Sequence, residues 1–152
     1  WPLIDGDDEI VRRAGKSIEK IFQESGEEEF RQMERGIIIE LCRQEGKIIT
    51  PGGGAFVDET NRSRMLESGE VFCLTASPTT IYQRLAAQRG TDPVRPLLEV
   101  EDPLGRIQEL MAERRTAYSQ AHHTIQTDEL DSKEIANLIA LTCGLRAPSA
   151  GV

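Results

Sequence analysis

Two short apolar segments, each followed at once by a loop of unusual composition, constrain the fold of this chain more than any other feature. Residues 3–4 lead into the acidic turn Asp5–Asp8, and residues 47–50 lead into the glycine run Gly52–Gly54. Strands that are apolar on both faces are typical of a parallel sheet covered by helices on each side. Because ligands of such sheets bind beyond the carboxyl ends of the strands, we expect the two loops to share one cleft.

Helical signals separate these segments from two further strands, expected at residues 71–74 and 123–126. The first predicted helix ends near Arg13, and a later one begins at Pro78. The others span residues 18–24, 27–44, 59–66, 104–118 and 132–141. Gly15 and Gly26 are expected to end the first two, and residues 89–102 lack periodicity, as in a loop. We therefore predict one α/β domain over residues 1–146, a three-layer parallel sheet with helices on both faces, followed by a disordered tail at 147–152.

Composition narrows the class of partner. The chain has 152 residues and a formal net charge of −8, which argues against nucleic acid or an anionic membrane as partner. No apolar run approaches the roughly 18 residues that a membrane span needs. Cys42, Cys73 and Cys143 lie far apart in apolar contexts and are interpreted as reduced, buried thiols of a cytoplasmic protein. We expect a monomer that acts on a small molecule.

The acidic turn offers the carboxylates of Asp5 and Asp7 on the same side of a strand end. Such a pair suits Mg²⁺ bound through water, or the orientation and deprotonation of a substrate hydroxyl. The alternative is a simple helix N-cap, for which Asp8 alone would suffice. The motif in isolation favours the cap.

The glycine run favours a binding role. Gly52, Gly53 and Gly54 remove every Cβ and permit positive φ, so that backbone N–H groups can approach a ligand closely. A flexible turn is the alternative, but it seldom needs three glycines directly after a buried strand.

Three arginines are candidates for holding an anion. Arg31 and Arg114 together would suit a carboxylate, since a bidentate clamp of arginines holds such a group well. Arg95, in the expected loop, suits a transferring phosphoryl group. Each has a plain alternative: Arg31 pairing with Glu34 at i+3 on a helix surface, Arg114 as a solvated charge, and Arg95 as a solubilising loop charge.

The segment Gly15-Lys16-Ser17 is similar to the end of a phosphate-binding G-x-x-x-x-G-K-[ST] loop, but the first required glycine is replaced by Ile10. A helix is also expected before it, where a phosphate-binding loop needs a strand. We interpret it as a helix boundary.

From Leu3 to about Leu141, the order and spacing of five motifs resemble the shikimate kinase family of P-loop phosphotransferases. The motifs include G-G-G-A at 52–55 and R-P-L-L at 95–98, beside D-x-D at 5–7, F-R-x-x-E at 30–34 and the arginines at 114–115. The resemblance implies transfer of the γ-phosphoryl group of ATP to the 3-hydroxyl of shikimate with Mg²⁺, in aromatic amino-acid biosynthesis.

The resemblance also implies a role for each candidate residue. Asp7 would orient or deprotonate the shikimate hydroxyls, Asp5 would organise Mg²⁺ through water, and the run centred on Gly53 would touch the ring hydroxyls. The shikimate carboxylate would be held by Arg31 and Arg114, with Glu34 supporting Arg31. On the nucleotide side, Arg95 would face the ATP phosphates and Arg84 would flank adenine.

One departure from the family pattern bears on activity. Family members carry a strand, a Walker A loop and a helix before the position of Trp1, and nothing in this sequence replaces them. We therefore expect the chain as given to lack the central strand and to be inactive alone. Alternatives are a non-catalytic shikimate-binding homologue, or a related kinase acting on gluconate or a nucleoside monophosphate, although paired arginines argue against a nucleoside.

Overall fold

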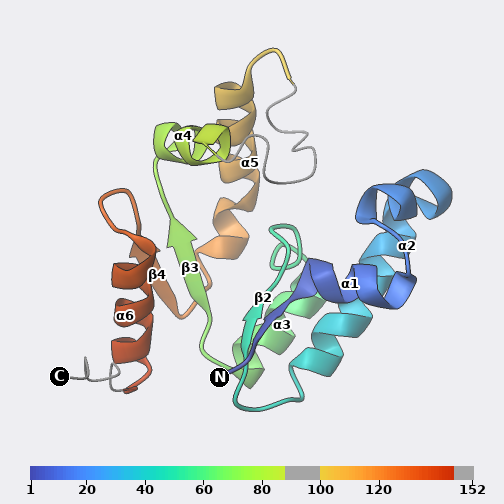
Figure 1. Ribbon diagram of the computed structural model, residues 1–152, viewed down its shortest axis with the longest axis horizontal. Coiled ribbons are helices and arrows are strands. Elements are labelled where there is room, and N and C mark those ends of the chain that lie inside the picture. Colours follow the sequence, from blue (N-terminus) through green and yellow to red (C-terminus); the bar gives the residue numbers. More distant parts are fainter. Residues whose placement is uncertain (88–99, 146–152) are drawn as a thin grey trace. The chain divides into compact units, whose positions relative to one another are not determined.

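The computed structural model describes residues 1–87 and 100–145, which divide into two compact units (Figure 1). The first unit is Trp1–Val71 and the second is Phe72–Val152. The predicted tail at 147–152, and nearly all of the loop predicted at 89–102, lie outside the described residues.

The first unit contains two strands and three helices. In chain order these are β1 (Leu3–Asp5), α1 (Gly6–Ala14), α2 (Ile18–Leu41), β2 (Ile48–Thr50) and α3 (Glu59–Ser68). β1 and β2 pair in parallel, with Leu3 opposite Ile48 and Asp5 opposite Thr50. Helix α2 packs against both α1 and α3. The parallel register brings the acidic turn after β1 and the glycine run after β2 to the same end of the pair.

The core of this unit forms where α1 meets α2. Its buried side chains come from one stripe of each helix: Ile10, Ile21, Phe30, Ile37 and Leu41. Ile4 and Ile49, from the centres of the two strands, pack against this cluster. In the second half of α2, Phe30, Ile37 and Leu41 therefore face the core together.

Glycines end the helices where the sequence predicts. Gly15 adopts the left-handed conformation (φ 65°) as the C-cap of α1, and Gly26 (φ 81°, ψ 175°) interrupts α2. Ser17 caps the following helix through a bond from the Lys20 N–H (3.2 Å), and Lys16 Nζ pairs with Glu24 (2.8 Å). The segment Gly15-Lys16-Ser17 is thus a helix boundary, as predicted.

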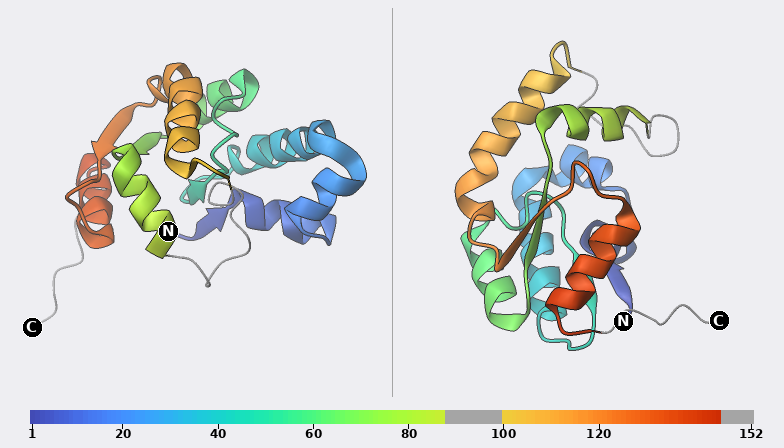
Figure 2. Two further views of the ribbon diagram at one scale, coloured as in Figure 1. Left: turned by 90° about the horizontal axis from the view of Figure 1, so that it is seen from above. Right: turned by 90° about the vertical axis from the view of Figure 1, so that its left-hand side faces the viewer.

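The second unit contains β3 (Phe72–Thr75), α4 (Pro78–Ala87), α5 (Pro103–Tyr118), β4 (His123–Gln126) and α6 (Ser132–Thr142). β3 pairs in parallel with β4, with Phe72 opposite His123, and α4 packs against α5 (Figure 2). Helix α6 begins with a capping box, in which Asp131 and Glu134 each accept the other's backbone N–H at 2.8 Å.

The α/β class and the parallel pairing of strands are confirmed, and one detail is corrected. The described strands pair within each unit, β1 with β2 and β3 with β4. The strands of the first unit are not buried on both faces. Leu3 and Ile48, which point away from the helical core, are 65% and 48% exposed. Alternate side chains of a strand point to opposite faces, and here the core covers one face. Whether residues 1–146 behave as one domain stays a prediction.

Two predictions made from composition can also be compared with the structure. The three cysteines are free, but each is only partly buried rather than fully buried. Within the described ranges, no helix combines the length and apolar character that crossing a membrane requires.

Candidate active site

The two aspartates of the acidic turn have different roles. Asp5 is the N-cap of α1: its Oδ1 accepts the N–H groups of Asp7 (2.9 Å) and Asp8 (3.1 Å). Its Oδ2 accepts the Thr50 hydroxyl (3.0 Å) and so ties the ends of β1 and β2 together. The capping role assigned to Asp8 is therefore corrected, because Asp5 stands at the non-helical position that a cap needs. The Asp7 carboxylate takes no part in the cap.

The glycine run lies directly against Asp7. A Cβ added at Gly52 would lie 2.8 Å from Asp7 Oδ1 and 3.3 Å from Oδ2. Neither Gly52 nor Gly54 has a φ in the left-handed region. The structure therefore explains these glycines by close approach rather than by the positive φ that we considered from sequence.

The other end of the run lies against Arg31, on α2. A Cβ at Gly54 would lie 2.8 Å from Arg31 Nη1, 3.0 Å from Nη2 and 3.2 Å from Cζ. One loop thus contacts both a carboxylate from the acidic turn and a guanidinium from the long helix. The first unit brings together three motifs that are separated in sequence.

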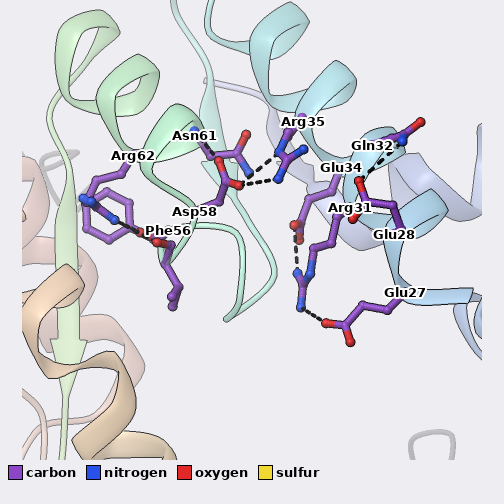
Figure 3. A network of polar contacts seen from close by, with 11 residues as sticks. Glu27, Glu28, Arg31, Gln32, Glu34, Arg35, Phe56, Asp58, Asn61 and Arg62 are labelled. Carbon is purple, nitrogen blue, oxygen red and sulfur yellow. Dashed lines mark hydrogen bonds and ion pairs between the residues drawn. The ribbon is translucent and has the colours of Figure 1, made fainter.

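Glu34, one turn further along α2, holds the Arg31 guanidinium. Arg31 Nη1 donates to Glu34 Oε2 at 2.8 Å, and Nη2 makes a longer bond of 3.4 Å to Glu27 (Figure 3). The guanidinium carbon also lies 5.2 Å from the centre of the Phe30 ring. The Glu34 side chain is only 4% exposed. The plain alternative, a solvent-exposed pair on the helix surface, does not describe this carboxylate.

Burial perturbs both carboxyl groups of the cluster. Burial raises the pKa of Asp7, and the charges of Asp5 and Asp8 raise it further, whereas Arg31 opposes them. Burial also raises the pKa of Glu34 against the opposing hydrogen bond and charge of Arg31. A carboxylate with a raised pKa accepts a proton more readily, which suits a general base.

A second ion pair, which the sequence analysis missed, lies on the same helix. Arg35 donates from Nε (3.0 Å) and Nη2 (2.9 Å) to Oδ2 of Asp58, the residue just before α3 (Figure 3). Asp58 Oδ1 accepts the Asn61 N–H (3.0 Å) as the N-cap of α3. An aspartate just before a predicted helix signals the cap, but no local pattern signals a partner 23 residues away.

Asn61 is the most completely buried polar side chain nearby, at 0% exposure. Among the described residues, neither Nδ2 nor Oδ1 of its side chain has a hydrogen-bond partner. A polar group buried in this way costs free energy, and the sequence carries no sign of it.

A cavity of about 250 Å³ lies between α2 and α3, away from these motifs. It is lined by Ile39, Cys42, Arg43, Arg64, Glu67 and Ser68. None of the predicted site residues lines it.

In the second unit, Arg84 is engaged with the loop after β4. Its Nη1 donates to the Thr127 hydroxyl (2.9 Å), and Nη2 donates to the Thr127 carbonyl. Next to it, Asp128 accepts the Ser77 N–H (3.0 Å) and the Thr80 hydroxyl, and these bonds hold the pKa of Asp128 well below its usual value. Arg84 therefore helps to fix the loop that leads into α6.

The remaining predicted residues are placed only in part. Arg114 lies on α5 of the second unit and is partly buried, whereas Arg115 beside it is exposed. Its partnership with Arg31 stays a prediction, and Arg95 lies outside the described residues. No group of three or more histidine, cysteine, aspartate or glutamate side chains gathers around a possible metal position within residues 1–87 and 100–145.

Parallel strands connected through helices, with acidic and glycine loops beyond the ends of β1 and β2, define a protein of the α/β class to which the P-loop small-molecule kinases belong. A family model for shikimate kinase matches residues 1–143. The chain belongs to the shikimate kinase family.

Individual relatives agree with this assignment. The shikimate kinase of Deinococcus radiodurans is 42% identical over 133 residues, which cover 88% of this chain and 65% of that relative. A shikimate kinase of Thermus thermophilus is 40% identical over 90% of this chain and 73% of its own length. The chain therefore spans about two thirds to three quarters of the length of these relatives.

Solved structures show the same fold. The shikimate kinase of Bacteroides thetaiotaomicron superimposes with a TM-score of 0.83 at 29% identity, covering 95% of this chain and 84% of that one. The shikimate kinase of Acinetobacter baumannii, solved in complex with shikimate, gives 0.77 at 30% identity, covering 94% and 78%.

Proposed function

We propose that the protein phosphorylates the 3-hydroxyl of shikimate with ATP. The observation that supports this most strongly is the convergence of Asp7, Arg31 and the glycine run in the first unit. A carboxylate, a guanidinium and an exposed backbone within one small region suit a ligand that carries both hydroxyls and a carboxylate. Membership of the shikimate kinase family supports shikimate as that ligand.

We propose a task for each group of the first unit. Arg31 binds the shikimate carboxylate, with Arg114 as its proposed second partner. Glu34 keeps the guanidinium in place by occupying Nη1, and the absence of a Cβ at Gly54 leaves room for it. The glycine backbone lets the ring approach Asp7.

Asp7 is the proposed base. It accepts the proton of the attacking hydroxyl while the hydroxyl oxygen bonds to the γ-phosphorus of ATP. The bond between that phosphorus and the β–γ bridging oxygen breaks, and ADP leaves with its electron pair. Its raised pKa favours this proton transfer. Positioning and charge stabilisation account for most of the catalysis of such a step.

The nucleotide side of the proposal rests on the second unit and on family membership. Arg84 would flank the adenine from its position at the loop after β4, and Arg95 would face the phosphates. Asp5 would contact Mg²⁺ through water, and the bound ion would neutralise phosphate charge. Both oxygens of Asp5 also accept hydrogen bonds from the protein. We further propose a cytoplasmic monomer.

Isothermal titration with shikimate, followed by an assay for ATP-dependent phosphorylation, tests the proposal. Arg31→Ala should abolish most of the binding, whereas Arg64→Ala, which alters an exposed pair on α3, should leave it unchanged. ATP-dependent phosphorylation would exclude the non-catalytic homologue. Preference for gluconate, or no shikimate binding at all, would contradict the proposed function.

A further inference from the structure

We propose that the Asp58–Arg35 ion pair is a positioning pair for the substrate site. The pair holds the end of the loop at residues 51–58, which contains the glycine run, against the helix that carries Arg31 and Glu34. The catalytic consequence of this pair rests on the proposed function, whereas its effect on the loop does not.

The pair joins two elements at a functional point. Both Nε and Nη2 of Arg35 reach the same oxygen, Oδ2 of Asp58, at 3.0 and 2.9 Å. Arg35 directly follows Glu34 on α2. A shift of Asp58 relative to α2 therefore moves the loop next to Glu34, which holds the Arg31 guanidinium (Figure 3).

Asp58 also fixes the beginning of α3. Its other oxygen, Oδ1, caps the helix through the Asn61 N–H at 3.0 Å, so the two oxygens serve different elements. Just before it, Arg62 Nη1 donates to the carbonyls of Val57 (2.8 Å) and Phe56 (3.2 Å). The fully buried side chain of Asn61 fills the space beside this point. The loop segment that follows the glycines is therefore held from three sides.

The start of the same loop is anchored separately. The Thr50 hydroxyl donates to Asp5 at 3.0 Å, immediately before the glycine run. Between these two anchors, Gly52 lies against Asp7 and Gly54 lies against Arg31. Release of the Asp58–Arg35 pair removes the contact that ties the Gly54 end of the run to α2, while the Gly52 end stays tied to β1.

The exposure of the pair explains why its effect should be local. The Arg35 side chain is 41% exposed and that of Asp58 is 19% exposed. A pair so accessible to water contributes little to global stability. Its measurable role is geometric, through the loop that it restrains.

Asp58→Asn separates the two functions of this residue, because asparagine is an equally good helix cap but carries no charge. Arg35→Gln removes the partner, and the double variant completes a mutant cycle. Arg64→Gln is the matched control, since it removes an exposed arginine paired with Glu67 at 3.7 Å on α3. Three measurements are made on each full chain: amide hydrogen exchange over residues 52–58, the thermal midpoint, and shikimate affinity by calorimetry.

Each single variant should exchange faster over the loop and bind shikimate roughly 2- to 5-fold more weakly, with a thermal midpoint close to that of the parent. The double variant should resemble the single variants, because both remove one interaction. Unchanged loop exchange in Asp58→Asn, or effects that add in the double variant, would overturn the inference. If the parent chain binds no shikimate, the proposed function fails, but loop exchange still decides the role of the pair.

Discussion

Arg31 and Gly54 lie so close together that a methyl group on the glycine would come within 2.8 Å of the guanidinium. This contact joins the long helix of the first unit to the loop after β2. It explains why a side chain is absent at that point of the loop.

Gly54→Ala should therefore displace the guanidinium with little loss of stability, because the tip of a flexible side chain can move aside. We expect shikimate affinity to fall by roughly 10- to 100-fold, since misplaced binding groups lose much of their effect. Calorimetry measures the affinity. Gly69→Ala is the control, because a Cβ there has no heavy atom within 4 Å. Equal affinities in the two variants would contradict the close-approach explanation.

The proposed carboxylate clamp predicts that Arg31→Ala and Arg114→Ala each weaken shikimate binding by roughly 2–5 kcal/mol, as expected when one partner of a desolvated charge pair is removed. Binding of a shikimate analogue with a neutral amide in place of the carboxylate should be much less sensitive to both substitutions. A variant that binds shikimate as tightly as the parent removes that arginine from the site.

The raised pKa of Glu34 makes a prediction about stability and pH. A carboxyl whose folded pKa lies above its unfolded value contributes stability at pH below the unfolded value, near 4.5, and loses it as the pH rises through the folded pKa. The free energy of unfolding of the parent, relative to Glu34→Gln, should therefore decline as the pH rises from about 4 toward neutrality. Urea unfolding across this range measures the difference. An increase with pH would show that the Arg31 pair outweighs burial.

Asn61→Leu should be neutral or should stabilise the protein by about 1 kcal/mol, because it replaces a buried amide that has no partner among the described residues with an apolar group of similar volume. Denaturant unfolding provides the measurement, and Asn61→Ala, which leaves a cavity, is the comparison. A loss of more than about 1 kcal/mol in the leucine variant would show that the amide has a bonding partner in solution.

Much of the local structure could be predicted from the sequence, because its causes are local. Gly15 and Gly26 end helices through their own backbone conformations, and the capping box joins Asp131 and Glu134, which are three positions apart. The convergence of the acidic turn and the glycine run could also be predicted, since parallel strands present their carboxyl ends at one edge.

Other features depend on contacts that a sequence pattern does not carry. The spacing of Arg31 and Glu34 fits an exposed helix pair as well as a buried one, and only packing decides that Glu34 is buried. The Asp58–Arg35 pair joins residues from different elements. Similarly, an apolar strand pattern predicts burial of both faces, but the core of the first unit covers only the side of Ile4 and Ile49.

The central claim is that Asp7, the glycine run and Arg31 form one site for shikimate. The most direct test is a titration of the isotope-labelled chain with shikimate. The NMR signals of the backbone amides and of the Arg31 side chain are monitored during the titration. The account predicts that the signals of Asp7, Gly53, Gly54 and Arg31 shift together with a single dissociation constant, and that these shifts vanish in Arg31→Ala. Shifts confined to the cavity between α2 and α3, or unaffected by that substitution, would contradict it.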